Sequence, residues 1–246
     1  MSIPKIIHYC WFGGGAISPE NRKCMESWKK YCPDYKIMAW NEQNFDISTN
    51  RYAQQAYEAK KYAFVSDYVR LAVLYEYGGI YLDTDVELVR PLDELLELPG
   101  FMGFQTNNEV ATGLGFGARK GNSVVQALLR DYDALDFLKA DGSADLTPCP
   151  ERNTRVLQAL GVRKDGTRQS IAEMEIFPAE YFCPMDFYSR ELRVTPKTYS
   201  IHRYAESWKP KPSAVSRILQ RLLKKHYYTW YCHLRGRIEG RLRKRT

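Results

Sequence analysis

Two aspartates one residue apart, Asp83 and Asp85, are the residues of this 246-residue sequence with the clearest chemical potential. They directly follow the short apolar stretch "GGIYL". Side chains two residues apart in an extended chain point to the same side, so the two carboxylates should converge and require a cation. Mn²⁺ and Mg²⁺ bind carboxylate oxygens together with substrate phosphates. The spacing therefore predicts a Mn²⁺ or Mg²⁺ site for a diphosphate at the carboxyl end of a strand.

Two other interpretations of this pair were weighed. A bare Asp-x-Asp is short, and aspartate favours turns, so a simple turn after the strand competes with the metal site. A calcium-binding loop would place Glu94 at its twelfth position, counted from Asp83. The sixth position of that loop needs glycine but holds Leu88, and Pro91 interrupts it, so the calcium loop is excluded.

A second pair of charged residues, Asp67 and Arg70, lies three positions apart within the largely apolar stretch "FVSDYVRLAVLYEY". Residues at this spacing share one face of a helix. Charged side chains are rarely buried without partners, so one interpretation of Asp67 and Arg70 is a structural ion pair. The functional interpretation places both side chains in the cleft of the metal, with Arg70 on a phosphate or sugar hydroxyl and Asp67 accepting from a sugar hydroxyl.

The surrounding pattern alternates strands and helices, which predicts an α/β fold with helices on the faces of a sheet. A helix is predicted over residues 21–33, and one helical region over residues 54–77 that ends near Gly78 and Gly79. Helices and loops are expected over residues 122–160. The predicted strands cover residues 3–11, 35–40, 80–82, 101–106 and 113–118.

Charge is unevenly distributed along the chain. The segment 209–246, hereafter the tail, has twelve Lys/Arg and one acid, whereas residues 1–208 hold 24 Lys/Arg and 28 Asp/Glu. The motif "KPKPS" at 209–213 marks the expected boundary between a domain of residues 1–208 and the tail. The asymmetry predicts an anionic partner for the tail, and no nucleic acid is expected on the acidic body.

Cysteines and hydropathy set further limits. The six cysteines form no C-x-x-C pair, so neither a zinc site nor a disulfide framework is expected. No apolar stretch is long enough for a membrane span, and the N-terminus lacks the pattern of a secretory signal. We therefore expect cytoplasmic residence.

The stretch "YAFVSDYVRLAVLYEYGGIYLDTDVELVRPLD" resembles the sugar-binding region of a DXD-containing glycosyltransferase family. That family includes fungal initiating α-1,6-mannosyltransferases and bacterial capsular-polysaccharide transferases, and the glucosylating domains of clostridial toxins are related. The segments "IPKIIHYCWFGG", "YKIMAWNEQNFDI" and "YSIHRYAESW" resemble further parts of the family. In the last segment, Arg203 stands where a second histidine is usual and Glu206 stands where a glycine is usual.

The resemblance implies a single GT-A, Rossmann-like domain that binds a nucleotide sugar, with UDP favoured over GDP. It implies that Asp83 and Asp85 hold the metal and that Arg70 assists catalysis. The residues implied in donor binding are Trp11, Asp67, Arg70, Tyr81, His202, Ser207 and Trp208. Trp11 and Tyr81 can instead be core residues, and His8 is expected to be a structural strand residue. A weaker prediction places Asn107, Asn108 and Glu109 on the acceptor side.

The implied reaction is hexosyl transfer with retention, in capsular or surface polysaccharide synthesis. Negative charge grows on the leaving diphosphate, which a divalent metal and an arginine can stabilise. A front-face route in which the leaving phosphate takes the acceptor proton needs no protein base, whereas a covalent route needs a carboxylate that the sequence does not identify.

The tail shows apolar residues at helical spacing opposite a basic face, followed by "RGRIEGRLRKRT". This pattern is typical of an interfacial helix on an anionic membrane, and the alternative is a helix packed on the body. A peripheral location at the inner face of the membrane and a lipid-linked saccharide acceptor are therefore expected. The competing function classes are a non-catalytic membrane- or nucleic-acid-binding protein acting through the tail, and a metal-dependent phosphoesterase.

Overall fold

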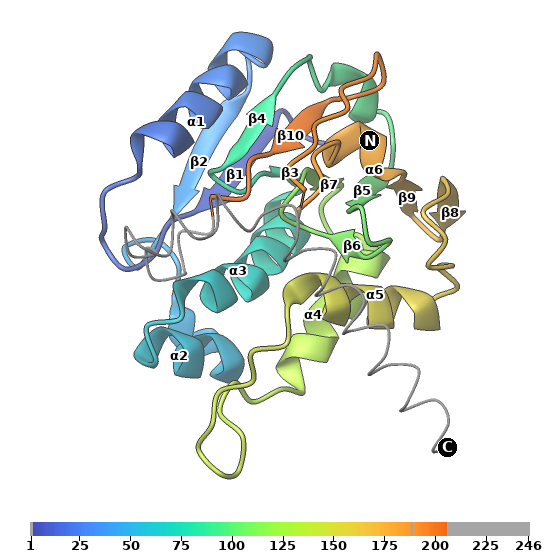
Figure 1. The fold of residues 1–246 in the computed structure, drawn as a ribbon. Coiled ribbons are helices and arrows are strands. Elements are labelled where there is room, and N and C mark those ends of the chain that lie inside the picture. Colours follow the sequence, from blue (N-terminus) through green and yellow to red (C-terminus); the bar gives the residue numbers. More distant parts are fainter. Residues whose placement is uncertain (1, 188, 206–246) are drawn as a thin grey trace. The chain divides into compact units, whose positions relative to one another are not determined.

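The structure is a computed structural model that describes residues 2–187 and 189–205 (Figure 1). The described residues form a main unit of residues 2–185 and 192–205, and a small part of a second unit, residues 186–191 without 188. In the second unit, the carboxylate of Asp186 accepts hydrogen bonds from the backbone N–H and the hydroxyl of Ser189, which close a short turn. The predicted tail lies outside the described residues.

A mixed β-sheet forms the centre of the main unit. Its strand order is β2-β1-β3-β7-β5-β9-β8, and β6 pairs with β5. The strands of this sheet are β1 (Ile6–Cys10), β2 (Lys36–Trp40), β3 (Gly79–Tyr81), β5 (Gly100–Phe104), β6 (Val110–Ala111), β7 (Phe116–Ala118), β8 (Gln169–Ile171) and β9 (Met174–Phe177). β1 runs parallel to β2 and β3, and β7 runs antiparallel to β3 and β5. The carboxyl ends of β1, β2 and β3 therefore meet at one edge, where ligands bind in open α/β sheets.

Helices cover both faces of this sheet (Figure 1). They are α1 (Pro19–Tyr31), α2 (Arg51–Glu58), α3 (Tyr62–Tyr77), α4 (Ser123–Asp133), α5 (Cys149–Ala159) and α6 (Ala179–Phe182), with 3-10 turns η1 (Ile47–Thr49) and η2 (Asp93–Leu95). Adjacent strand residues point to opposite faces, and Ile80 and Tyr81 belong to different apolar clusters. One cluster packs under α2, α3 and α4, and the other under α1 and η2. The predicted α/β fold class is thus confirmed, with the arrangement expected of a GT-A domain.

One predicted element is corrected. The region 54–77 was expected to be continuous, but α2 ends at Glu58 and α3 begins at Tyr62. Lys60 between them adopts a left-handed φ of 56°, and the N–H of Lys61 bonds back to the carbonyl of Ala56 at 2.8 Å. The apolar periodicity continues across this break, which is why the sequence pattern did not reveal it.

The end of α3 depends on two glycines. Gly78 and Gly79 have φ values of 66° and 108°, which side-chain-bearing residues rarely adopt. A Cβ at Gly79 would lie 2.8 Å from Nε2 of His8, and a Cβ at Gly78 would lie 2.7 Å from the backbone N of Lys120. These contacts fix the path from α3 into β3, and so the position of the residues that follow β3.

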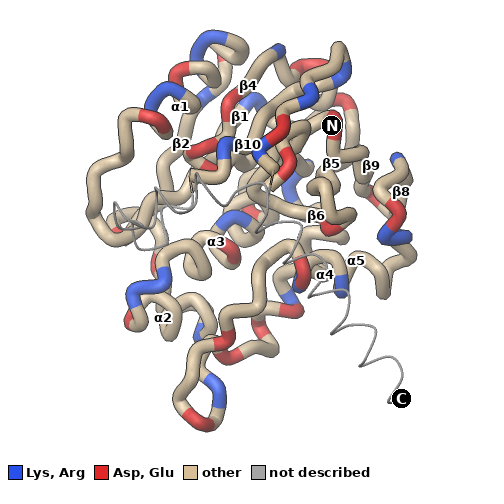
Figure 2. The backbone as a smooth tube through the Cα atoms, viewed as in Figure 1, with Lys and Arg blue, Asp and Glu red and all other residues tan. Residues whose placement is uncertain are grey.

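A separate two-stranded antiparallel sheet pairs β4 (Val86–Leu88) with β10 (Ser200–His202). Its register places His202 opposite Val86 and Ser200 opposite Leu88. α1 supports β4, since the indole of Trp28 donates to the carbonyl of Val86 at 2.7 Å. Acidic and basic residues both lie around these two strands (Figure 2). The pairing brings His202 beside the residues that precede β4.

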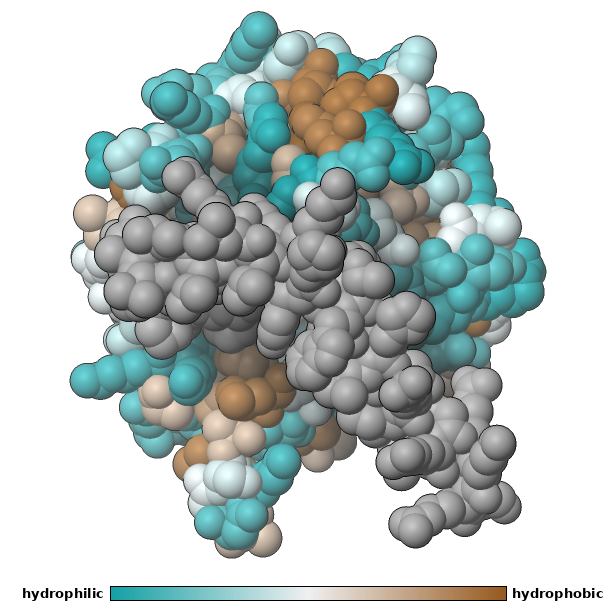
Figure 3. All heavy atoms as spheres, in the orientation of Figure 1, coloured by the Kyte–Doolittle hydropathy of each residue, from teal (hydrophilic) through white to brown (hydrophobic). Residues whose placement is uncertain are grey.

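The surface of the main unit is largely hydrophilic on the face drawn in Figure 3, and its apolar side chains form small patches. Of the helices in the part of the chain that the structure describes, not one combines the length and apolar character that a bilayer span requires.

Candidate active site

The sequence Asp83-Thr84-Asp85 forms a turn between β3 and β4 rather than an extended segment. The N–H of Val86 bonds to the carbonyl of Asp83 at 3.0 Å, which closes the turn. Thr84 is buried, and its hydroxyl accepts a hydrogen bond from the amide of Asn21 on α1 at 2.9 Å. The turn interpretation was therefore correct for the backbone, and the carboxylates still converge as predicted.

Asp83, Asp85 and His202, hereafter the acidic cluster, offer ligand atoms that all lie within 4.8 Å of one another. All three side chains are partly buried. His202 comes from β10, so the site needs the β4–β10 pairing as well as the β3–β4 turn. The sequence predicted His202 as a donor-site residue, and the structure brings it to the two aspartates.

The side chain of Asp83 is held by two donors on one oxygen. The hydroxyl of Tyr81 donates to Oδ1 at 2.9 Å, and Nη2 of Arg70 lies 3.1 Å from the same oxygen. Oδ2 faces Gly113, where a Cβ would lie only 2.0 Å from it. Oδ2 has no hydrogen-bond partner among the described residues, so the carboxylate presents one oxygen toward the space beside Gly113.

Asp85 and His202 form the other side of the cluster. Oδ1 of Asp85 lies 3.2 Å from Nε2 of His202, and Oδ2 accepts from the N–H of Ala205 at 2.8 Å. Burial disfavours the charged form of Asp85, but His202 and these hydrogen bonds outweigh it and hold the pKa of Asp85 at about 2. Burial likewise lowers the pKa of His202, but the carboxylate of Asp85 raises it above its usual value. The pair is thus arranged to keep Asp85 ionised.

Arg70 and Asp67 lie behind Asp83 on the buried face of α3. Their side chains are 3.2 Å apart, and the guanidinium stacks over the ring of Tyr81 at 4.8 Å. Burial raises the pKa of Asp67 to about 6, although Arg70 opposes the shift. The interpretation as an ion pair is confirmed, and Arg70 also reaches Asp83 of the acidic cluster, whereas the contacts of Arg70 and Asp67 with a donor stay a prediction.

Four residues that the sequence did not single out complete this environment. Arg70 Nη1 lies 3.4 Å from the hydroxyl of Thr112 and 3.7 Å from the thiol of Cys149. The amide of Asn153 on α5 donates to Thr112 at 3.1 Å, and the carbonyl of Gly113 accepts from the N–H of Asp83 at 3.1 Å. Burial raises the pKa of Cys149 to about 12, so its thiol is a packing group. Of these four residues, only Thr112 and Gly113 offered a sequence signal, because they are a pair of small residues that follows a predicted strand.

Trp11 lies at the same edge of the sheet as the cluster. β1 and β3 are parallel with His8 opposite Tyr81, so Trp11 and Asp83 follow neighbouring strand ends. The indole N–H of Trp11 donates to the carbonyl of Gly15 at 2.5 Å. His8 itself is fully buried, with Nε2 near the carbonyl of Gly78 at 2.9 Å and Nδ1 accepting from Trp40 at 3.0 Å. His8 is therefore a structural residue.

Among the described residues, the contacts of the predicted acceptor-side residues Asn107, Asn108 and Glu109 do not include the acidic cluster. Asn107, Asn108 and Glu109 occupy the turn between β5 and β6, where Asn107 donates to Glu109 at 2.9 Å and Lys164 pairs with Glu109 at 3.1 Å. The guanidinium of Arg203 pairs with Glu87, while the backbone N–H of Arg203 bonds to the backbone carbonyl of Asp85 at 2.9 Å. The predicted residues Ser207 and Trp208 lie outside the described residues.

The donor set fits a hard divalent cation. Two carboxylates and an imidazole converge, the Gly113 position leaves room at Oδ2 of Asp83, and Nδ1 of His202 is buried without a hydrogen-bond partner among the described residues. Carboxylate oxygens suit Mg²⁺ and Mn²⁺, and imidazole binds transition metals. The acidic cluster is therefore the candidate metal centre.

Comparison with known proteins agrees with this geometry. Residues 18–101 match the family described as "Glycosyltransferase sugar-binding region containing DXD motif". This range runs from the N-cap of α1 to β5 and includes Asp67, Arg70, Asp83 and Asp85. The resemblance expected from the sequence is confirmed over residues 18–101, which match the model of this DXD-containing glycosyltransferase family.

Curated relatives include inositol phosphoceramide mannosyltransferase 3 of Schizosaccharomyces pombe, 29% identical over 55% of this chain and 39% of its own length. Human alpha-1,4-N-acetylglucosaminyltransferase is 28% identical over 60% of this chain and 38% of its own length. The chain thus spans less than half the length of these relatives. The solved structure "PaToxG Glycosyltransferase" has a TM-score of 0.47 and 21% identity over 64% of this chain and 69% of that one.

Proposed function

We propose that the chain is a metal-dependent glycosyltransferase that moves a hexosyl group from a nucleotide sugar, UDP-linked more readily than GDP-linked, to a saccharide acceptor. The observation that carries this proposal is the convergence of Asp83, Asp85 and His202 at the carboxyl edge of β1 and β3, with Arg70 bonded to Asp83. The family match over residues 18–101 supports the reaction class.

Asp83 and Asp85 would hold Mn²⁺ or Mg²⁺, with His202 at the third position. The bound ion supplies Lewis-acid stabilisation of the leaving diphosphate. Tyr81 and Arg70 both bind Oδ1 of Asp83, so they orient the carboxylate with Oδ2 toward the ion-binding space. The low pKa of Asp85 keeps this carboxylate charged across the neutral range.

Arg70 would place a permanent positive charge beside the developing negative charge of the diphosphate. Its guanidinium is buried, so its field is weakly screened by water and acts more strongly than at an exposed site. Asp67 would accept a hydrogen bond from a donor-sugar hydroxyl. Trp11, at the same edge, would stack on the nucleotide base, and Ser207 and Trp208 would close over the diphosphate.

The anomeric configuration is proposed to be retained by front-face transfer. In this route the acceptor oxygen attacks from the side on which the diphosphate departs, and the leaving phosphate oxygen takes the acceptor proton. The route needs no protein carboxylate beneath the anomeric carbon. Asn107, Asn108 and Glu109 are proposed as acceptor-side residues.

The proposed acceptor is lipid-linked, in capsular or surface polysaccharide synthesis. Residues 1–208 would form the transferase domain, and the tail would bind anionic lipid at the inner face of the membrane. Sedimentation with anionic liposomes tests this part: removal of residues 213–246 should abolish co-sedimentation. Equal sedimentation of the shortened and full-length chains would refute it.

The decisive test of transfer is release of nucleoside diphosphate from a panel of UDP- and GDP-sugars, with Mn²⁺ or with EDTA. Asp85→Asn and Asp83→Asn test the cluster, and Asp136→Asn is the matched control because Asp136 pairs with Arg51 on α2, outside the cluster. Metal-dependent release by the parent and control chains but not by the cluster variants supports the proposal. No release from any donor, or release unaffected by EDTA, would contradict it.

A further inference from the structure

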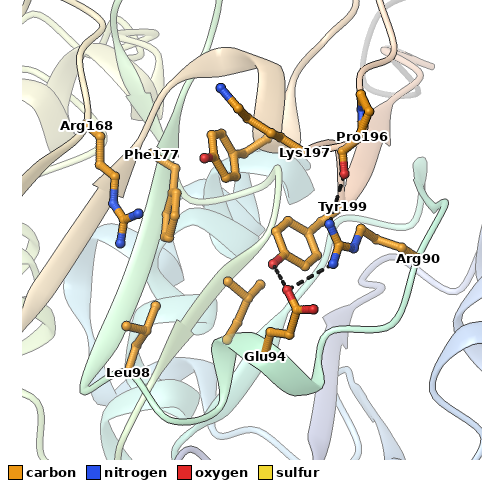
Figure 4. A pocket seen from close by; sticks show the side chains of 10 residues that line it. Arg90, Glu94, Leu98, Arg168, Phe177, Pro196, Lys197 and Tyr199 are labelled. Atoms are coloured by element: carbon orange, nitrogen blue, oxygen red, sulfur yellow. Dashed lines mark hydrogen bonds and ion pairs between the residues drawn. The ribbon is translucent and has the colours of Figure 1, made fainter.

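A second pocket of about 360 Å³ opens where η2, β9, α6 and the segment before β10 meet (Figure 4). We call it the basic pocket, lined by Arg90, Glu94, Leu95, Leu98, Arg168, Phe177, Tyr181, Pro196, Lys197 and Tyr199. Its volume lies in the range of small-molecule sites. None of these residues belongs to the acidic cluster.

Each cation of the basic pocket stands over an aromatic ring that also lines it. The distances from the cationic group to the ring centroid are 4.4 Å for Arg90 over Tyr199, 4.8 Å for Arg168 over Phe177, and 6.0 Å for Lys197 over Tyr181. Such contacts hold long cationic side chains against the pocket wall. The pocket therefore presents charge and ring surface together.

The carboxylates that pair with two of these cations are set back from the opening. Arg168 is 54% exposed but its partner Glu175 only 18%, and Lys197 is 59% exposed but its partner Glu180 only 33%. Neither glutamate lines the pocket. Glu94 does line the pocket and is 68% exposed, where it pairs with Arg90. Arg168 and Lys197 are thus more exposed than their own partners, and exposed ion pairs of this kind hold their partners weakly and leave donors available.

The aromatic side of the basic pocket is preorganised. The rings of Tyr181 and Tyr199 are stacked, with centroids 6.3 Å apart and planes 23° apart. The hydroxyl of Tyr199 donates to Glu94 at 2.8 Å, and Arg90 donates to the same carboxylate and to the carbonyl of Pro196 (Figure 4). Tyr199 is only 6% exposed, so it is the ring of the partly exposed Tyr181 that can match the C–H face of a sugar, and these polar atoms match its hydroxyls.

The β4–β10 sheet connects the basic pocket to the acidic cluster. Asp85 and His202 lie at one end of the two strands, whereas Arg90 and Tyr199 follow and precede the other end. The N–H of Val89 bonds to the carbonyl of Tyr199 at 2.9 Å, so the pairing extends to the pocket. His202 and Tyr199 are three residues apart, about 10 Å of strand.

We infer that the basic pocket is an accessory binding site for an acidic saccharide, a sugar chain bearing carboxylate or phosphate groups. Arg168 and Lys197 bind the anionic groups, Tyr181 binds a ring face, and Tyr199 supports the ring of Tyr181 from behind. The assignment of a saccharide, rather than another flat anion, rests on the proposed function. The site would hold a distant part of the acceptor chain.

Binding is measured without donor or metal, so the result is independent of whether transfer occurs. The probes are a tetrasaccharide that alternates glucuronic acid with N-acetylglucosamine, the neutral maltotetraose, and inorganic phosphate. Titration calorimetry gives the affinity, and NMR follows the aromatic ring signals. The variant is Arg168→Gln with Lys197→Gln, both of which change exposed side chains. Arg51→Gln is the matched control, because Arg51 lies on α2, away from the pocket, and pairs with one carboxylate, that of Asp136.

We expect the acidic tetrasaccharide to bind the parent and the control equally and to shift the tyrosine ring signals. The double variant should bind it at least tenfold more weakly, while maltotetraose should bind the parent at least tenfold more weakly than the acidic probe. Equal affinity of parent and double variant would overturn the inference. So would phosphate binding as tightly as the acidic tetrasaccharide, or no detectable binding of that probe.

Discussion

The acidic cluster and the basic pocket lie at opposite ends of the β4–β10 sheet. Their cations differ in burial and in the number of carboxylates that they contact. Arg70, beside the acidic cluster, is 6% exposed and contacts two carboxylates. In the basic pocket, each cation is more exposed and pairs with one carboxylate. Buried charges depend strongly on their partners, whereas exposed pairs contribute little to stability. The comparison separates a site whose charges are structurally required from one whose charges are available for a ligand.

The largest expected effect is on transfer by the acidic cluster. Asp85→Asn removes a charge that the bound ion needs, so kcat/KM for donor turnover should fall by at least about 10³-fold, the scale of losing a key electrostatic group. Initial rates of nucleoside diphosphate release provide the measurement. Arg168→Gln should lower the same rate with a small saccharide acceptor by less than twofold. Similar losses of kcat/KM in Asp85→Asn and Arg168→Gln would contradict the proposed difference between the acidic cluster and the basic pocket.

The next effect concerns the stability of the region around Arg70. Arg70→Met leaves Asp67 and Asp83 without their cation, and this should reduce the free energy of unfolding by about 3–5 kcal/mol. Urea denaturation followed by fluorescence gives the value. Adding Asp67→Asn to Arg70→Met should recover part of the loss, since an unpaired carboxylate is then removed. A loss below 1 kcal/mol would show that the buried charges are well solvated.

His8 adds a third case to the comparison of buried and exposed charges, because it is a buried titratable group that the fold keeps neutral. Burial lowers its pKa from 6.5 to about 4, so between these values the unfolded chain binds a proton that the folded chain does not. Its contribution to stability is therefore complete above pH 6.5 and is lost as the pH falls toward 4, by about 3 kcal/mol.

The difference in unfolding free energy between the parent and His8→Gln, measured by urea denaturation at several pH values, isolates this contribution. Asp67 titrates in the same range with the opposite sign, because its pKa is raised to about 6, and its effect cancels in the difference. A difference that does not change between pH 7 and pH 4 would contradict the assignment.

The smallest expected effect is on the stability of the basic pocket. Arg168→Gln and Lys197→Gln each break one exposed ion pair, and each should change the free energy of unfolding by less than about 1 kcal/mol. Thermal unfolding of both variants beside Arg70→Met tests the contrast directly. A larger loss in either pocket variant would mean that the pocket cations are structural.

The sequence predicted much of the edge of the sheet at which the site lies. Alternating patterns predicted the strands β1, β2 and β3. The spacing of Asp83, Asp85, Asp67 and Arg70 predicted that these side chains lie together, which the structure confirms, while their role in a site stays a prediction. The grouping of these residues could be predicted because they come from one stretch of chain that runs from α3 through β3 to the turn.

The remaining parts depend on contacts between distant segments. Thr112 and Cys149 reach Arg70, and Asn153 reaches Thr112, only because the residue after β6 and the start of α5 lie beside Arg70, and their types carry no signal alone. The basic pocket likewise draws on η2, β9, α6 and the chain before β10. The break between α2 and α3 was missed because apolar periodicity continues through a single left-handed residue.

The pairing of β4 with β10 joins residues that are made at very different times. The backbone N–H that bonds Asp85 belongs to Ala205, 120 positions later in the chain. The ribosome therefore synthesises Asp83 and Asp85 long before His202, the third residue of the acidic cluster. Nascent chains that lack β10 would therefore carry Asp83 and Asp85 without His202, and the acidic cluster would stay incomplete until β10 has been synthesised and paired with β4.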